Sequence, residues 1–341
     1  MSSKILKYKA DYRTFAFVVI YYLAAYLCLL NTQAIYAQGG VLGIFLLCAF
    51  VCVMSFICAV AVHNTIHCPI FYNKTHNKLF QYVLSLAYGY SVSSYVPGHN
   101  FSHHKEVQTA KDGMRTTKLR FKWNFLNQLL FFFFVTSAIL TAEKRWTQKM
   151  KNVKKEWYNQ WLTEMILVHG VKIGTLFIDP IGSILFIWIP HVYAAWGIVS
   201  TNMWQHDGCD VDHKYNHSRT FTGPLLNFLT MNNGYHGAHH DRPSLHWSLL
   251  PAYHEENIAP YIHPNLNQKS LFIYLWKANI YPGKRLNYDG SPFILPPAVD
   301  DIDWVADVMV SDKKHAFDFG AESATVNQIL NTTDQTLQDA S

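Results

Sequence analysis

Four long apolar stretches constrain the fold of this chain more than any other feature. They occupy residues 14–36, 41–62, 161–178 and 181–203. A helix rises about 1.5 Å per residue, so stretches of this length cross the roughly 30 Å hydrocarbon layer of a membrane. Short links at residues 37–40 and 179–180 contain Gly or Pro and predict tight turns. We therefore expect an all-α integral membrane protein with four transmembrane helices in two hairpins.

The composition indicates that the chain also contains a substantial polar region besides the membrane helices. Half of the 341 residues are hydrophobic (50%) and 15% are charged, yet the mean hydropathy is only +0.01. Apolar stretches must therefore alternate with strongly polar ones. We expect a membrane domain over residues 1–298 that includes a cytoplasmic helical cap at about 207–298, followed by a polar, acidic and solvated tail at 299–341. Residues 1–12 are basic and lack a cleavage pattern, so residues 14–36 are expected to remain as the first span.

Two further apolar stretches, residues 79–96 and 125–142, are expected not to cross the membrane. Clusters of histidines flank residues 79–96, and they can meet on one side of the membrane only if that stretch is interfacial or re-entrant. Positive charge marks the cytoplasmic side, and it flanks both ends of residues 125–142. The basic residues before this stretch are Lys111, Arg115, Lys118, Arg120 and Lys122, and those after it are Lys144, Arg145, Lys149, Lys151, Lys154 and Lys155. With four spans, both chain ends and all the histidine clusters are expected on the cytoplasmic side. The alternative, that residues 125–142 also cross the membrane, stays open.

Nine histidines form four tight clusters, each at the end of an apolar stretch. The clusters are His63 and His67, then His99, His103 and His104, then His206, and finally His236, His239 and His240. Imidazole is the commonest metal ligand, and residues three or four apart lie on one face of a helix. One zinc ion needs only three or four protein ligands. Nine histidines therefore indicate two metal ions, and a nitrogen-rich set of ligands with exchangeable positions suits redox iron better than structural zinc.

Other polar residues near the clusters are candidates for supporting roles. Asn202 lies one helical turn before His206 and is expected to act indirectly, since an amide is a weak ligand beside imidazole. Four carboxylates could accept the second N–H of a ligand histidine or could equally be solvated: Glu106, Asp112, Asp207 and Asp241. His169 and His191 lie within spans and are expected to face the protein interior. The six cysteines show no CxxC pair, so neither disulfides nor an iron–sulfur cluster are indicated.

The order HxxxH, HxxxHH and HxxHH resembles the integral-membrane fatty acid desaturase superfamily of di-iron enzymes. The stretch from Asn233 to His240, followed by Leu250, Pro251 and His254, is similar to the third histidine box of acyl-lipid desaturases. The Asn202 to His206 spacing resembles the NxxxH motif of acyl-CoA desaturases, which supplies one ligand and a water-mediated asparagine. The resemblance implies a di-iron centre held by the nine histidines, with dioxygen as co-substrate and a fatty acyl chain as substrate.

This resemblance leaves several functions open. Desaturation of the chain is favoured, and hydroxylation of a lipid or alkyl chain is the main alternative. A membrane zinc hydrolase would leave most of the nine histidines unused, and a haem carrier would need paired histidines inside the lipid. No cytochrome b5 segment, dinucleotide fingerprint or ferredoxin cysteine pattern is present. We therefore expect a separate electron donor, such as cytochrome b5 or a ferredoxin with its reductase, and no nucleic-acid partner. The basic segments could dock an acidic donor or anionic head groups, or could serve only to fix the topology. The expected location is the bacterial inner membrane or the endoplasmic reticulum.

Overall fold

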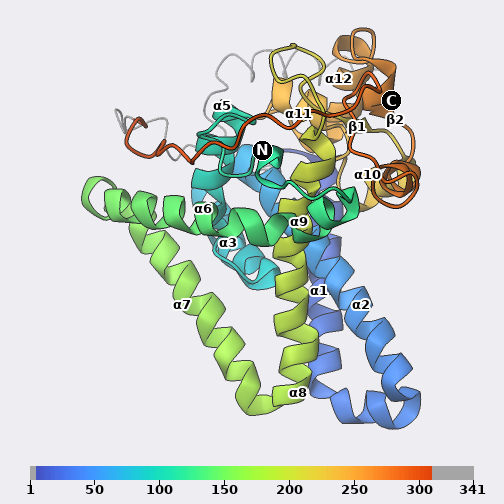
Figure 1. Cartoon of the computed structure of the whole chain (residues 1–341). Helices are drawn as coiled ribbons and strands as arrows, with labels where there is room; N and C mark the ends of the chain where they lie inside the picture. The colour runs from blue at the N-terminus through green and yellow to red at the C-terminus, as the bar shows by residue number, and fades with distance from the viewer. Residues whose placement is uncertain (1–4, 309–341) are drawn as a thin grey trace, which may run out of the picture.

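The computed structural model describes residues 5–308 and is mostly helical. Several long helices project to one side of the molecule, while short elements gather at the other side (Figure 1). The long helices are α1 (Tyr12–Leu30), α2 (Thr32–His67), α6 (Asn124–Val153), α7 (Lys155–Ile178) and α9 (Ile189–His206).

The remaining elements are short and mostly cover the base of the long helices. In the first half of the chain they are η1 (Lys9–Asp11), α3 (Lys74–Tyr88), α4 (Val92–Val96), the π-helical turn η2 (Pro97–His103), α5 (His104–Glu106) and η3 (Thr116–Lys118). The element α8 (Pro180–Ser183) and the π-helical turn η4 (Ile184–Trp188) lead into α9. The later elements are β1 (Thr220–Phe221), α10 (Pro224–Leu229), α11 (His236–Asp241), η5 (Trp247–Leu249), α12 (Leu250–Asn257), η6 (Pro264–Leu266), β2 (Asn267–Gln268), α13 (Leu271–Leu275) and η7 (Trp276–Ile280).

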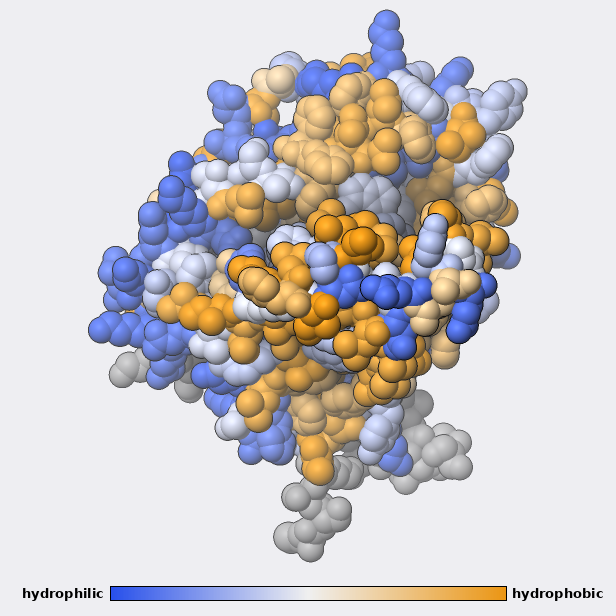
Figure 2. Space-filling view, turned by 90° about the horizontal axis from the view of Figure 1, so that it is seen from below, coloured by the Kyte–Doolittle hydropathy of each residue, from blue (hydrophilic) through white to orange (hydrophobic). Residues whose placement is uncertain are grey.

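The projecting helices carry the apolar surface expected of membrane helices. Leu46 and Ile166 are more than half exposed, and Phe177 is 87% exposed at the far end of α7. Seen from below, hydrophobic side chains dominate this end of the molecule (Figure 2). Among the described residues, 5 helical segments are long and apolar enough to cross a membrane, and they include α6. The chain is thus a mostly helical protein with several apolar helices, as predicted.

The direction of α6 sets it apart from the other long helices. It runs across the molecule where α1, α2, α7 and α9 emerge, while those helices extend away from it (Figure 1). The apolar residues 125–142 form only its first part, and the helix continues through the basic residues Lys144 and Lys151. Length and composition alone admit α6 as a span, but its orientation agrees with the expectation that this stretch lies along the membrane surface.

The first turn between membrane helices lies earlier than predicted. The sequence predicted a helix over residues 14–36, whereas α1 ends at Leu30 and Gly40 then breaks the path of α2 with a φ of 60°. Polar side chains cause the early end, because Asn31 Nδ2 donates to Leu27 O at 2.8 Å and Thr32 Oγ1 donates to Cys28 O at 3.1 Å. These bonds satisfy carbonyls that a helix end leaves free. The second turn was predicted correctly: Asp179 accepts hydrogen bonds from the first N–H groups of α8, and Pro180 begins that helix.

Residues 79–96 do not form one helix. They divide into α3 and α4 at Gly89, which has a φ of 82° and ends α3 in the left-handed conformation. Lys172 Nζ from α7 donates to Gly89 O at 2.8 Å, and the His191 ring of α9 packs against the Gly89 Cα. Neither α3, with 15 residues, nor α4, with 5 residues, is long enough for a span, which agrees with the expectation that this stretch does not cross the membrane.

The cap contains more irregular structure than predicted. Its helices are one or two turns long, and two short parallel strands, β1 and β2, pair Thr220 with Asn267 and Phe221 with Gln268. The strand pair joins the two ends of the segment that contains α10, α11 and α12. The all-α prediction therefore missed a small sheet. Strands of two residues are too short to produce a recognisable hydrophobic pattern in a sequence.

Part of the acidic tail packs on the protein, although residues 299–303 are exposed. Trp304 is 5% exposed and lies against Trp146 of α6 with ring centroids 6.0 Å apart. Aspartates of this segment form ion pairs with basic residues that were candidates for binding an electron donor. The ion pairs are Asp301 with Arg115 and with Lys118, Asp303 with Arg145, and Asp307 with Lys111. Residues 309–341 of the predicted tail lie outside the described residues.

We predict that Gly89→Ala destabilises the protein strongly. A Cβ at this position would lie 2.1 Å from His191 Cγ, and the positive φ disfavours any L side chain. We expect a loss of about 2–4 kcal/mol in the free energy of unfolding, measured as a lower thermal midpoint in detergent. Gly170→Ala in α7 is the matched control, because nothing lies within 4 Å of its Cβ position. Equal midpoints for the two variants would contradict this account of the turn.

Candidate metal centre

The structure brings all nine cluster histidines together at the base of the long helices. His63 and His67 end α2, His206 ends α9, and His236, His239 and His240 lie on α11. His99 and His103 lie on the π-helical turn η2, and His104 begins α5. The nine rings form two groups, within each of which the candidate ligand nitrogens all lie within 4.8 Å of one another. The first group is His63, His67, His99, His104 and His239, and the second is His103, His206, His236 and His240.

Helical spacing explains which histidines share a group. His63 and His67 are four residues apart in an α-helix and lie on one face, and so do His236 and His240. His239 lies on another face of α11 and joins the first group.

The π-helical turn changes this rule for the second cluster. The His104 N–H bonds to His99 O, five residues back, so a wider turn closes between them. Their Nε2 atoms lie 3.1 Å apart in the first group, while His103 is directed to the second group.

The separations between ring nitrogens fit shared metal ions. His236 Nε2 lies 2.8 Å from His206 Nε2, and His239 Nε2 lies 3.2 Å from His104 Nε2. Two nitrogens that each lie about 2.1 Å from one ion, at a right angle to each other, are about 3 Å apart. In addition, Nε2 of His67 and Nε2 of His240 are buried without a hydrogen-bond partner among the described residues. Buried polar atoms are rarely left without a partner, so the ring nitrogens of both groups fit metal ions.

Hydrogen bonds to the far side of some rings fix their orientation. His206 Nδ1 donates to His217 O at 3.0 Å, and His103 Nδ1 lies 3.1 Å from Asp112 Oδ2. With Nδ1 protonated, the lone pair of Nε2 faces the group, which is the arrangement that metal-binding histidines usually show. His63 Nδ1 similarly contacts Asn64 Oδ1 at 3.2 Å.

Burial keeps these imidazoles neutral. It lowers the pKa of five ring histidines well below the usual value, and their histidine neighbours lower it further: His99, His104, His236, His239 and His240. A neutral ring has a free nitrogen lone pair at neutral pH, which metal binding requires.

Of the four candidate carboxylates, only Asp112 contacts a cluster histidine. It is 0% exposed and also accepts hydrogen bonds from Gln108 N and Met114 N. Burial by itself would raise the pKa of Asp112, but His103 and the two backbone N–H groups outweigh it and lower the pKa. Asp112 is therefore ionised and holds the His103 ring.

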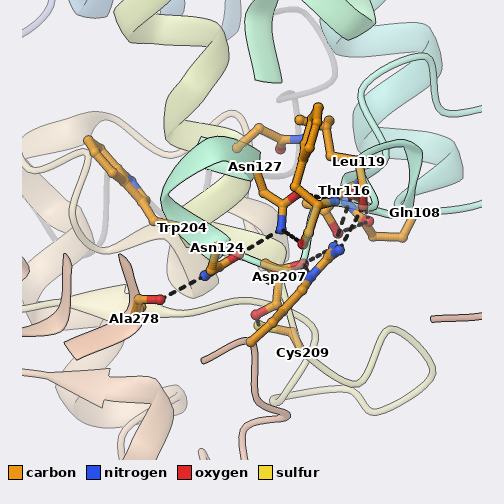
Figure 3. Close-up of polar contacts among 12 residues, drawn as sticks. Gln108, Thr116, Leu119, Asn124, Asn127, Trp204, Asp207, Cys209 and Ala278 are labelled. Carbon is orange, nitrogen blue, oxygen red and sulfur yellow. Dashed lines mark hydrogen bonds and ion pairs between the residues drawn. The ribbon is translucent and has the colours of Figure 1, made fainter. Parts of the chain in front are cut away.

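The other three carboxylates have other partners. Arg285 binds Asp207, with Nε 2.9 Å from Oδ1, and also donates to the carbonyls of Thr116 and Leu119 (Figure 3). Asp241 accepts from the Tyr253 hydroxyl, and Glu106 accepts from Thr109 Oγ1 at 3.4 Å. The Asp207 network ties the end of α9 to the segment that follows the second histidine cluster.

The remaining predictions about polar residues had mixed outcomes. Asn202 Nδ2 donates to Met114 O at 2.5 Å, and no hydrogen bond joins Asn202 to a cluster histidine within the described chain. His191 faces the interior as expected, with Nε2 2.7 Å from the Tyr21 hydroxyl. The expectation for His169 was wrong, because its side chain is on the exposed surface of α7.

An apolar cavity of about 160 Å³ lies beside both histidine groups. His63 and His99 of the first group and His103 and His236 of the second line it. Its other walls come from α6, α9 and the segment between α3 and α4, and include Phe132, Ile139, Leu140, Ala195, Ile198 and Val199. A mostly apolar cavity with a few converging polar groups is typical of a ligand site.

A comparison with known protein families agrees with this geometry. The model of the family described as fatty acid desaturase matches residues 39–269, which include all four histidine clusters. The chain belongs to the fatty acid desaturase family. No curated protein shows significant similarity to it.

Membership of the fatty acid desaturase family confirms the resemblance found in the sequence. The protein is therefore an oxidoreductase of the desaturase or hydroxylase type, a family known for its use of iron. Its two buried histidine groups are able to hold metal.

Glu143 also lines the cavity but was not among the residues predicted from the sequence. It follows the apolar stretch at the edge of a basic segment. No motif marks this residue, and only its position on α6 brings it to the cavity.

We predict that Asp112→Asn weakens metal binding at the second histidine group alone. The asparagine cannot accept all the hydrogen bonds of the carboxylate, so His103 loses its fixed orientation. We expect about a 10–100-fold weaker affinity at one of two positions, seen as a biphasic Fe²⁺ binding isotherm.

Asp241→Asn serves as the control for this measurement, since Asp241 is also next to a cluster histidine in the sequence but bonds to Tyr253. Full binding at both positions in Asp112→Asn would show that this carboxylate does not support a ligand.

Proposed function

We propose that this protein is a membrane di-iron oxidoreductase that desaturates a fatty acyl chain. The observation that carries the proposal is the pair of buried, all-histidine groups side by side at one apolar cavity. We assign the nine histidines as the ligands of two iron ions, with Asn202 acting indirectly. A membrane zinc hydrolase would need only one such group.

The two ions, when bound, would supply the oxidising power for breaking an unactivated C–H bond with dioxygen. The protein's residues supply the positioning. Ile139, Leu140 and Ile198 form apolar walls that hold a methylene segment and keep water away. Four ring histidines lie at the same cavity, so the chain is held next to both groups. Desaturation removes two hydrogen atoms from neighbouring carbons, while dioxygen and two electrons from the donor give water.

Hydroxylation of a lipid or alkyl chain is the alternative at the same site. In both reactions, removal of the first hydrogen atom leaves a carbon radical on the substrate. In hydroxylation this radical takes up oxygen, whereas in desaturation a second hydrogen atom is lost. The apolar cavity accommodates both outcomes, and the third histidine cluster, which is similar to that of acyl-lipid desaturases, favours desaturation.

The proposed arrangement in the membrane has α1, α2, α7 and the α8–α9 unit as the four spans. The surface helix α6 lies along the interface, so all four histidine clusters and both chain ends face the cytoplasm. Electrons would come from a separate donor such as cytochrome b5 or a ferredoxin with its reductase. Since the 299–308 segment pairs with Lys111, Arg115 and Arg145, we place the docking surface for an acidic donor at the exposed Lys144, Lys151 and Lys155 near the α6–α7 corner.

The test of the reaction is expression of the full chain in a host with a defined lipid profile and mass spectrometry of its lipids. We predict a new product about two mass units lighter than its parent lipid, since desaturation removes two hydrogens. His239→Ala should abolish this product with little loss of folded protein, because one metal position opens while the helices keep their packing.

His76→Ala is the matched control, since His76 is exposed on α3 and belongs to neither group. A product about sixteen units heavier would establish the hydroxylase alternative. Near-normal turnover and iron content in His239→Ala would contradict the di-iron assignment.

We further predict different outcomes for Asn202→Ala and His206→Ala. Loss of His206 removes a ring from the second group, so we expect iron to be partly lost together with activity. Loss of Asn202 removes only its bond to Met114 O and a polar group at the cavity. That variant should therefore keep its iron and turn over about 10–100-fold more slowly. Iron analysis and product analysis of both variants in parallel check this, and full iron with full activity in both would remove these residues from the site.

A further inference from the structure

Glu143 places a carboxylate at the wall of the apolar cavity. It lies on α6 and is half-buried. One oxygen, Oε1, accepts hydrogen bonds from Ser94 Oγ at 2.5 Å and from Trp161 Nε1 at 3.2 Å. The other oxygen, Oε2, has no hydrogen bond or ion pair with any described residue. The carboxylate is thus fixed in position by one oxygen and has a free acceptor at the other.

No positive charge neutralises this carboxylate within the described chain. Lysine and arginine are absent from the residues that line the cavity. The nearby Arg145 pairs with Asp303 instead. A carboxylate at a mostly apolar wall is one of the few polar groups that can orient a ligand there.

A second buried glutamate nearby shows what a purely structural carboxylate looks like in this protein. Glu164 of α7 is 0% exposed and does not line the cavity. Both of its oxygens are used: Oε2 accepts from Ser91 Oγ at 2.6 Å and from Ser93 N at 2.8 Å, and Oε1 accepts from Gln160 Nε2 at 3.0 Å. Glu143 differs from Glu164 in having one oxygen left over at the cavity.

Three tyrosine hydroxyls add polar groups to the side of the cavity where Glu143 lies. Tyr88 at the end of α3, Tyr90 in the turn and Tyr95 in α4 line it, and none of their hydroxyls has a hydrogen-bond partner in the described chain. Tyr95 also packs against His99, with ring centroids 5.0 Å apart. The polar side therefore lies directly beside the first histidine group.

We propose that Glu143 determines substrate specificity by accepting a hydrogen bond from an O–H or N–H group of the substrate. This inference rests on the proposed oxidation of an alkyl chain and narrows the class of chain. A hydroxyl or amide group close to the reacting carbons fits the free oxygen, whereas a free carboxylate or a phosphate meets a like charge. The cavity is about the size of one that holds a benzene ring, ~150 Å³, so the polar group and the reacting carbons lie only a few bonds apart.

The test is binding of radiolabelled dodecanol, dodecanamide and dodecanoate to the purified, iron-loaded full chain in detergent at about pH 8, where dodecanoate is ionised. We expect the wild-type protein to bind dodecanol and dodecanamide at least about tenfold more tightly than dodecanoate, as a hydrogen bond to a charged group requires. Glu143→Gln keeps an oxygen for Ser94 and Trp161 but removes the charge. It should reduce the ratio to about threefold or less by strengthening dodecanoate binding.

Glu164→Gln is the matched control and should keep the wild-type ratio. Comparison between variants cancels differences in how the three probes enter micelles. Equal affinities in the wild-type protein, no saturable binding of any probe, or an unchanged ratio in Glu143→Gln would overturn the proposal. The measurement involves no turnover, so a selective protein that yields no oxidised lipid would contradict the proposed reaction and leave the role of Glu143 standing.

Discussion

The burial of nine imidazole rings around two points is the constraint on which the rest of this structure depends. Each ring carries nitrogens that need a partner once water is excluded, and burying them without one is unfavourable. Four separate segments of the chain converge to place the rings in two groups. Several ring nitrogens meet each other at about 3 Å, and others have no protein partner, so the rings offer an unusual number of lone pairs to a bound ion. Metal ions meet this need for partners.

The surrounding fold can be understood as the support for these two groups. α2 and α9 pack against each other and end at His67 and His206, so they bring the first and third clusters to the same level. The turn at Gly89 lets the chain return from α3 through α4 to that level. Arg285 joins Asp207 at the end of α9 to Thr116 and Leu119, which follow the second histidine cluster; these three partners are labelled in Figure 3. Trp304 packs against Trp146 in the later part of α6.

Sequence reasoning reached the features that depend on local spacing. Pairs such as His63 and His67 follow directly from helical periodicity, and the turn at Pro180 follows from the chemistry of proline. The family could be recognised from the order of the clusters. Features that depend on the backbone path or on distant contacts could not be predicted. The π-helical turn that separates His103 from His104 has no sequence signature, and the contact of Asp112 with His103 is one of four that looked equally plausible.

Charge patterns were the least reliable guide, because their partners come from elsewhere in the chain. Lys111 and Arg145 had the appearance of a docking surface, but in the fold they pair with Asp307 and Asp303, from the far end of the described chain. Glu143 had no visible role in the sequence, and it became informative only when the structure placed it at the cavity with one oxygen free of protein partners.

Metal analysis of the purified wild-type protein tests the central claim most directly. Elemental analysis of protein produced with ferrous iron and zinc both available should find about two iron ions per chain and little zinc, because two histidine groups with open positions suit redox iron. A content of about one zinc ion per chain, with no iron bound, would contradict the account and favour the hydrolase alternative.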